Sequence, residues 1–163
     1  MKKILNNIVN AKKAKLDKNG IWTTDLKLSK ELGESHKTWE KIYNFNIAKL
    51  KTDRAEFNES KLDDHVSYIE KYYKFTSKSI YLEIGWGPSY IAEYLIKTYN
   101  CNFIGVDFNY GMLVTLKNYF DSKGYKNFLL IHADINNLPI RTGTIDYIYG
   151  GGVIEHFRNP SIV

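Results

Sequence analysis

The stretch SIYLEIGWGP, residues 79–88, decides the fold. Its first six residues form a short apolar run, and two glycines and a proline follow at once. A short apolar run that ends at glycines is typical of a strand buried inside a sheet. Pro88 suits the first turn of a helix, because the N–H group that proline lacks would have no partner there. The stretch therefore predicts a buried strand, a tight turn and the start of a helix.

Strands and helices continue to alternate after this stretch. Apolar runs predict three more strands, at 103–107, 128–132 and 145–149. Apolar residues at helical spacing predict helices at 90–95, at 112–120 and from 153 onward. Strand–helix–strand units of this length predict the α/β class, with a mostly parallel sheet and helices on both faces.

The chain changes character near residue 79. Before it, apolar residues such as Leu62, Val66 and Ile69 recur at helical spacing, which predicts amphipathic helices. Residues 1–20 hold six lysines and one acidic residue, whereas the rest of the chain is nearly neutral. We therefore expect a basic N-terminal arm with helices over residues 1–78, followed by a second unit over residues 79–163.

Composition narrows the class of protein. Apolar residues make up 44% and charged residues 25%, the balance of an ordinary soluble globular protein. The single cysteine, Cys101, excludes a disulfide scaffold and a cysteine-rich zinc module. No apolar run is long enough to span a bilayer or to serve as a signal peptide, so we expect a cytoplasmic protein. Only three of the 23 basic residues are arginines, which disfavours nucleic acid as a partner without excluding contact through the basic arm.

The residues that carry chemistry lie at the expected carboxyl ends of the strands, where parallel sheets bind ligands. Gly85 and Gly87 allow a tight turn that a ligand can approach closely. Asp107 ends the second strand, 20 residues after Gly87, where a carboxylate can accept hydrogen bonds from a ribose diol. The alternative is that Asp107 caps the next helix, a role for which Asn109 competes. The combined pattern favours a ligand that contains a nucleoside.

The sequence disfavours the common dinucleotide and nucleoside triphosphate ligands. A dinucleotide fingerprint needs a third small residue at the place of Tyr90, so NAD is disfavoured. The sequence also lacks the glycine-rich run with Lys and Ser or Thr that binds the phosphates of ATP or GTP.

From Tyr81 to Phe157 the chain resembles the first half of a class I S-adenosylmethionine-dependent methyltransferase with a Rossmann-like fold. Four segments carry the resemblance in order: residues 83–89 (EIGWGPS), 105–109 (GVDFN), 133–139 (ADINNLP) and 145–156 (IDYIYGGGVIEH). Ser89 departs from the family, since a third glycine often stands there. The resemblance implies the strand order 3-2-1-4 for the part present, a lid formed by the N-terminal helices, and a chain that lacks the C-terminal part of the fold.

The resemblance also implies S-adenosylmethionine as the cofactor and assigns roles around it. Gly85 and Gly87 would pass under the methionine part, and Glu83 would reach its amino group. Asp107 would hold the ribose hydroxyls. The remaining contacts would be those of Phe108 with the adenine face, Asp134 and the Ile135 N–H with the adenine edge, and Gly150 and Gly151 with the methyl end.

Methyl transfer needs a general base only if the acceptor keeps its proton until attack. The candidate bases are His156, Glu155, His36 and His65, each of which also has a plain structural interpretation as a helix-end or surface residue. His132, at a strand end, is expected to be a buried, hydrogen-bonded histidine rather than a ligand. No H-x-x-x-H or Cys/His cluster exists, so we expect no metal.

Three functions remain open on the sequence. The first is a methyltransferase for a small-molecule acceptor, which the neutral body of the chain favours. The second is a methyltransferase that acts on RNA or protein, and the third is a non-catalytic module that binds S-adenosylmethionine. The fourth strand would be an exposed apolar edge, which favours pairing between copies of the chain.

Overall fold

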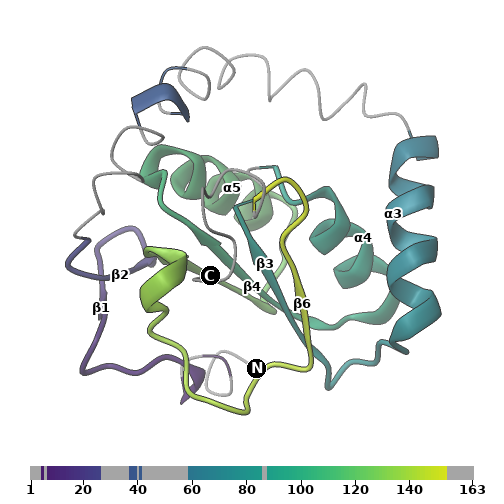
Figure 1. The fold of residues 1–163 in the computed structure, drawn as a ribbon, viewed down its shortest axis with the longest axis horizontal. Helices are drawn as coiled ribbons and strands as arrows, with labels where there is room; N and C mark the ends of the chain where they lie inside the picture. Colours follow the sequence, from purple (N-terminus) through teal and green to yellow (C-terminus); the bar gives the residue numbers. More distant parts are fainter. Residues whose placement is uncertain are drawn as a thin grey trace.

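The computed structural model describes residues 5, 7–26, 37–39, 41, 59–85 and 88–153. Figure 1 shows a twisted sheet with helices packed against it. The strands are β1 (Lys15–Leu16), β2 (Trp22–Thr23), β3 (Ile80–Ile84), β4 (Asn102–Asp107), β5 (Phe128–His132) and β6 (Tyr147–Tyr149). The helices are α3 (Glu59–Tyr72), α4 (Tyr90–Tyr99) and α5 (Tyr110–Ser122), and a 3-10 turn spans Ile135–Asn137. The described part therefore has the mixed α/β class that the sequence predicts.

The four strands predicted from residue 79 onward form the parallel part of the sheet. The full order is β1-β2-β5-β4-β3-β6, so the predicted order of these four is confirmed. Ile84 pairs with Val106, Asp107 pairs with His132, and Glu83 pairs with Tyr149. This register brings the carboxyl ends of β3, β4, β5 and β6 to one edge of the sheet.

Two short N-terminal strands extend the sheet on the other side, which the sequence analysis did not predict. Trp22 of β2 pairs in parallel with Ile131 of β5, and β1 pairs antiparallel with β2. Residues 15–23 therefore share a sheet with the segment that the sequence analysis placed in a second unit. Each strand is two residues long, too short to leave a periodic signal in the sequence. The lid role expected of residues 1–78 stays a prediction.

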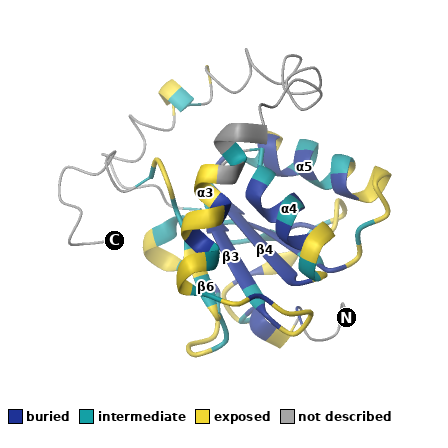
Figure 2. Ribbon diagram, turned by 90° about the vertical axis from the view of Figure 1, so that its right-hand side faces the viewer, coloured by how far each residue is buried: buried dark blue, intermediate teal, exposed yellow. Residues whose placement is uncertain are grey.

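Helices α3, α4 and α5 cover one face of the sheet. Their apolar residues, among them Ile69, Leu95 and Phe120, pack on Tyr81 and Phe103 in one buried cluster. Figure 2 shows this pattern, with buried residues along β3, β4 and the inner sides of α4 and α5. The cluster fixes α4, which follows the glycine turn after β3, and α5, which follows Asp107, and so positions the start of each helix.

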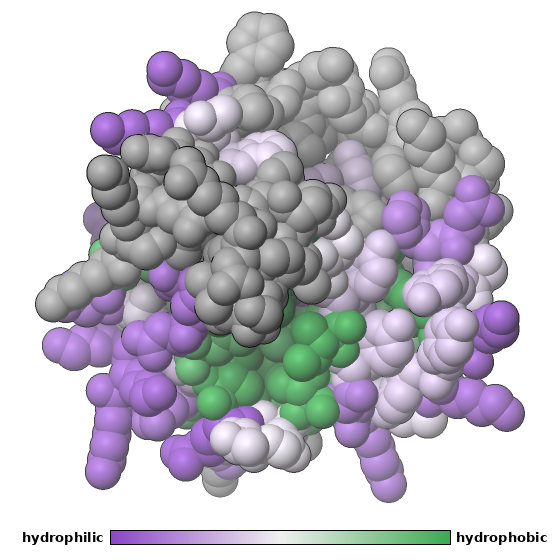
Figure 3. All heavy atoms as spheres, viewed as in Figure 1, coloured by the Kyte–Doolittle hydropathy of each residue, from purple (hydrophilic) through white to green (hydrophobic). Residues whose placement is uncertain are grey.

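The second face of the sheet is covered by the N-terminal residues and by the loop after β5. Leu5, Ile8 and Val9, the first two of them helical, pack against Leu82 and Ile104. Leu138, Ile140 and Ile145 of the loop pack against the same cluster. Figure 3 shows an apolar patch on the face of the molecule seen in Figure 1. Helical structure is thus present on both faces, as predicted, although the long helices share one.

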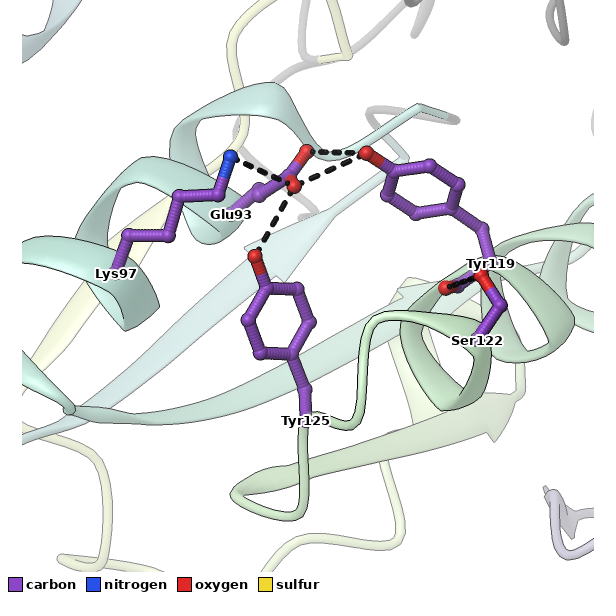
Figure 4. A network of polar contacts seen from close by, with 5 residues as sticks. All are labelled: Glu93, Lys97, Tyr119, Ser122 and Tyr125. Atoms are coloured by element: carbon purple, nitrogen blue, oxygen red, sulfur yellow. Dashed lines mark hydrogen bonds and ion pairs between the residues drawn. The ribbon is translucent and has the colours of Figure 1, made fainter.

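A polar network ties α4 to α5 (Figure 4). The buried carboxylate of Glu93 accepts hydrogen bonds from the hydroxyl of Tyr119, at 3.0 and 3.1 Å, and from that of Tyr125, at 3.1 Å. Lys97 forms an ion pair with the same carboxylate at 3.0 Å. Three donors thus compensate the loss of water around a buried charge, as burial of a carboxylate requires.

Candidate functional site

The site lies at the shared carboxyl edge of the strands, and Gly85 forms its floor. The N–H of Gly85 donates to the carbonyl oxygen of Val106 at 2.8 Å, which joins the turn after β3 to β4. Gly85 has a φ of +65°, in the left-handed region that favours glycine. A β-carbon at this position would lie 2.7 Å from Cγ2 of Val153, so the segment after β6 packs directly on the turn.

A small pocket opens beside this turn. It is lined by residues of β3, β4 and α5 and by the residue before α4, which are Glu83, Ser89, Gly105, Val106, Asp107, Leu113 and Leu116. Ser89 occupies the place of the family's third glycine and has a φ of +50°. Serine therefore takes the conformation that glycine takes more readily, at a strain cost of about 1–2 kcal/mol.

Asp107 lies at the end of β4 with 6% of its surface exposed. Its Oδ1 accepts the N–H of Asn109 at 2.7 Å. Asn109 is the residue that caps α5, since its own Oδ1 accepts the N–H of Met112 at 3.0 Å. The capping role that competed for Asp107 belongs to Asn109, and Asp107 is one of the residues that line the pocket.

Glu83 is the second carboxylate on the pocket, with 2% of its surface exposed. Its Oε2 accepts the hydroxyl hydrogen of Tyr81 at 2.8 Å. Burial raises the pKa of Tyr81 well above its ordinary value, and the nearby charge of Glu83 raises that pKa further. Tyr81 therefore remains a hydrogen-bond donor that orients Glu83.

Phe108 follows Asp107, and the structure fixes its backbone. Nε2 of His132 lies 2.9 Å from the carbonyl oxygen of Phe108, which identifies the imidazole N–H as the donor. The hydroxyl and the N–H of Thr24 both donate to the carbonyl oxygen of His132, at 3.2 and 3.1 Å. His132 is thus hydrogen-bonded, as the sequence predicts, but it is half-buried rather than buried because it ends its strand. Thr24, directly after β2, supports it.

A second N-terminal contact holds the start of α5. The hydroxyl of Tyr110 donates to Oδ2 of Asp17 at 2.5 Å and accepts from the side-chain amide of Asn19 at 2.7 Å. Burial acts to raise the pKa of Asp17, but the hydrogen bonds from Tyr110 and from the backbone of residues 19–21 outweigh it, so the pKa is lowered. These hydrogen bonds attach the β1–β2 hairpin to the first residue of α5, the helix that begins beside Asp107.

Asp134 and Ile135 follow β5 at the same edge. Oδ1 of Asp134 accepts the N–H of Asn136 at 2.9 Å and caps the 3-10 turn that Ile135 begins. Oδ2 of Asp134 has no hydrogen-bond partner among the residues that the structure describes. One oxygen thus shapes the turn, and the other is available to an amino group of a ligand.

Gly150 and Gly151 follow β6, next to a contact that the sequence analysis missed. The hydroxyl of Tyr149 lies 2.8 Å from Nδ1 of His65 on α3. A β-carbon on Gly151 would lie 2.7 Å from that hydroxyl, so the turn after β6 passes closely over Tyr149. Of the candidate bases, the structure brings His65 to this edge. The place of Tyr149 directly before the glycines is the signal that would have identified it.

Several predicted site residues lie outside the described part of the chain. These are Gly87, Glu155, His156 and His36. Within the described ranges no three His, Cys, Asp or Glu side chains gather as metal ligands would. None of the helices described is long and apolar enough to cross a membrane.

The described residues fit a nucleoside with a cationic amino acid tail. Acidic side chains follow or end three neighbouring strands at Glu83, Asp107 and Asp134, and a glycine turn with positive φ lies between the first two. Carboxylates suit a ribose diol, an adenine amino group and an ammonium group.

Comparison with solved structures shows the same fold. Phosphoethanolamine N-methyltransferase 2 of Haemonchus contortus, in complex with phosphomonomethylethanolamine and S-adenosylhomocysteine, superposes with a TM-score of 0.56 at 15% identity, over 61% of this chain and 23% of that chain. A protein of Methanococcus maripaludis assigned as an S-adenosyl-L-methionine-dependent methyltransferase gives 0.54 at 18%, over 85% and 58%. A SAM-dependent methyltransferase of Aquifex aeolicus gives 0.51 at 18%, over 65% and 63%. The chain spans less than two thirds of each of these proteins.

No curated protein matches the sequence. A family model described as a methyltransferase domain matches residues 82–163, which is half of the chain. The match begins in β3 and includes the glycine turn, Asp107, Asp134 and the turn after β6. The chain therefore belongs to the methyltransferase-domain family and has the Rossmann-like fold of class I S-adenosylmethionine-dependent methyltransferases.

Proposed function

We propose that this chain binds S-adenosylmethionine and catalyses transfer of its methyl group to a small-molecule acceptor. One observation carries the proposal: the buried carboxylates of Asp107 and Glu83 line one pocket at the carboxyl edge, beside the glycine turn at Gly85. Family membership and the Rossmann-like fold support the same chemistry. The bound cofactor supplies a methyl group that its sulfonium already activates, so the protein contributes mainly position and environment.

Each group at the edge has a role in holding the cofactor. Asp107 accepts hydrogen bonds from the ribose hydroxyls, and Glu83 accepts from the amino group of the methionine part. Gly85 lets that part lie close to the backbone. The adenine is held by Phe108 at its face, and by Asp134 and the N–H of Ile135 at its edge. Gly150 and Gly151 border the methyl end.

Two features of the chain support a small acceptor. The segment from residue 79 onward is nearly neutral, whereas binding to nucleic acid generally requires a basic face. The residues after β6 are three glycines and a valine, not the Asn-Pro-Pro-Tyr type of sequence suited to a planar nitrogen of a base or an amide. RNA and protein acceptors are alternative outcomes of the test below.

The cofactor is tested by calorimetric titration with S-adenosylhomocysteine and, in parallel, with NAD. Asp107→Asn is the informative variant, because its amide oxygen can still accept the N–H of Asn109 while the charge is removed. We expect saturable binding of S-adenosylhomocysteine, no binding of NAD, and an affinity about 10- to 100-fold weaker in the variant, which corresponds to about 1.4–2.8 kcal/mol. Asp121→Asn, at an exposed carboxylate of α5, is the matched control. Equal affinities in Asp107→Asn and the wild type would contradict the ribose role.

The acceptor is tested with tritiated S-adenosylmethionine and fractions of a cell extract. Label in the small-molecule fraction supports the proposal. Label that nuclease or protease releases would assign an RNA or protein acceptor instead. Binding without any transfer of label would leave a module that holds the cofactor and does not react.

A further inference from the structure

The hydrogen bond between Tyr149 and His65 joins two parts of the chain that lie 84 residues apart. The tyrosine ends β6, and the histidine lies in the middle of α3. Their rings meet edge to face, with centroids 6.1 Å apart and an interplanar angle of 79°. The imidazole nitrogen Nδ1 lies 2.8 Å from the phenol oxygen.

The pair stands at the methyl end of the proposed site. Tyr149 pairs in register with Glu83, the carboxylate assigned to the methionine part. The turn that follows Tyr149 passes over its hydroxyl at Gly151 and then places Val153 against Gly85. The Tyr149 hydroxyl is therefore connected, through a single four-residue turn, to the glycine that forms the floor of the site.

The chemistry of the pair favours proton transfer. Burial raises the pKa of Tyr149, and the charges of Glu83 and Tyr147 raise it further. The phenol therefore keeps its hydrogen, and the 2.8 Å separation lets it donate that hydrogen to Nδ1 of the imidazole. A phenol oxygen that donates to one partner can still accept a hydrogen bond from another. Such a pair can take up a proton at the oxygen while it passes its own hydrogen to the nitrogen.

We propose that Tyr149 accepts the proton of the methyl acceptor and that His65 takes the hydrogen of Tyr149 in the same step. This inference rests on the proposed function. The bond between sulfur and the methyl carbon breaks as the bond between the acceptor atom and that carbon forms. The acceptor proton moves to Oη of Tyr149, and the original phenol hydrogen moves to Nδ1 of His65. The positive charge lost at sulfur appears on the imidazolium, so atoms and charge balance.

The surroundings of the pair suit this role. Among the described residues, the titratable groups close to it are Glu83 on β3, Tyr147 on β6, and Asp64 and Tyr68 on α3. His65 is exposed, so its proton can pass to water after each transfer. Tyr149 is the group placed to touch the acceptor, and His65 acts through it.

The hydrogen bond itself is tested by nitrogen NMR of the imidazole. In the wild type we expect the signature of a neutral ring whose Nδ1 accepts a hydrogen bond, and we expect Tyr149→Phe to lose it. Tyr147→Phe is the matched control, since it removes a phenol from the same face of the same strand. Identical His65 spectra in Tyr149→Phe and the wild type would overturn the pairing, independently of any turnover.

The proton step is tested by transfer of label from tritiated S-adenosylmethionine to the small-molecule fraction of a cell extract. A general base typically contributes 10²–10⁴-fold, so we expect Tyr149→Phe to lose about 100-fold in rate while its affinity for S-adenosylhomocysteine stays within about twofold. The wild-type rate falls at acid pH, because a protonated imidazole cannot accept a hydrogen. His65→Gln keeps an acceptor for the phenol but cannot take its proton. Its rate should therefore be slower than that of the wild type and should not show the fall at acid pH, which we call the acid limb.

Three results would overturn the relay. One is a Tyr149→Phe rate within about threefold of the wild type. Another is an acid limb that persists in His65→Gln. The third is a wild type that binds S-adenosylhomocysteine and transfers no label at any pH. A wild type that does not bind S-adenosylhomocysteine would overturn the proposed function itself, and so is distinguished from failure of the relay.

Discussion

The side chain of Val153 lies directly over Gly85, so close that a β-carbon on the glycine would be 2.7 Å from Cγ2 of the valine. Gly85 follows β3, and Val153 lies in the turn after β6. Their close contact leaves no space for a side chain at position 85. We expect Gly85→Ala to lower the free energy of unfolding by about 2–4 kcal/mol, from positive φ and overpacking together, and to abolish calorimetric binding of S-adenosylhomocysteine.

Gly143→Ala is the control for that experiment. Gly143 has a φ of +73°, close to the +65° of Gly85, but no atom lies within 4 Å of its β-carbon position. The free energy of unfolding of Gly143→Ala should fall only by the cost of a positive φ, about 1–2 kcal/mol. The variant should bind S-adenosylhomocysteine as the wild type does. Equal losses in the two variants would show that the contact with Val153 contributes nothing.

Ser89 gives the opposite prediction. Because its φ is +50°, replacement by glycine should relieve strain and raise the free energy of unfolding by about 1 kcal/mol, measured by urea denaturation. Ser89→Ala keeps the strained backbone and removes only the hydroxyl, so it should bring no gain. A gain in the alanine variant as large as that in the glycine variant would assign the effect to the hydroxyl.

The network around Glu93 should contribute to stability mainly through its tyrosines. Glu93→Gln removes a buried charge that accepts from Tyr119 and Tyr125, and we expect it to cost about 2 kcal/mol in denaturant unfolding. Lys97→Met should cost less than about 0.5 kcal/mol, because the lysine side chain is 60% exposed and its ion pair is screened. A lysine variant as unstable as the glutamine variant would contradict this division.

The hairpin contact between Asp17 and Tyr110 predicts a dependence of stability on pH. The fold lowers the pKa of Asp17 below its ordinary 3.8, so its contribution is present above that value and is lost as the pH falls through the folded-state pKa. We expect Tyr110→Phe to have a lower free energy of unfolding than the wild type at about pH 6, and we expect this difference to become smaller at about pH 3. Asp25→Asn, at an exposed residue after the hairpin, should show no such narrowing. A gap that does not change with pH would contradict the charged hydrogen bond.

The edge strand β6 predicts self-association. Ile148, in its centre, is 59% exposed. We expect Ile148→Lys to reduce association in sedimentation velocity, because a charge on an edge strand opposes pairing between sheets. Leu16→Lys, at a residue 53% exposed on the opposite edge, is the control. Equal effects of the two substitutions would indicate non-specific association through exposed apolar residues rather than pairing through β6.

The parallel core of the fold could be predicted from the sequence because each of its strands is an apolar run, and because β3 and β4 are each followed by a helix with one apolar side. The same reasoning found Asp107, and it named Asn109 as the competing helix cap, a role that the structure assigns to Asn109. In both cases the information is local to a few consecutive residues.

The features that the sequence did not predict depend on contacts between segments that are far apart in the chain. Trp22 and Thr23 carry no strand pattern of their own and become a strand only where the edge of β5 offers partners. His65 looks like a surface residue of an amphipathic helix, and only the packing of α3 on the sheet brings it to Tyr149. Ser89 occurs in the family's glycine motif, yet its positive φ is a property of the turn and cannot be read from its residue type.

The pairing of β2 with β5 joins Trp22 to Ile131, across most of the described chain. A ribosome makes about 5–20 residues per second, so the hairpin leaves the exit tunnel several seconds before its partner strand exists. During that time the exposed backbone of the hairpin and the apolar side chains of Leu5, Ile8 and Val9 have no sheet to join. The hairpin is thus among the last parts of the sheet to find its partner, and closing so long a loop favours slow folding. A cell that makes this chain would need to shield its N-terminal segment until β5 has emerged.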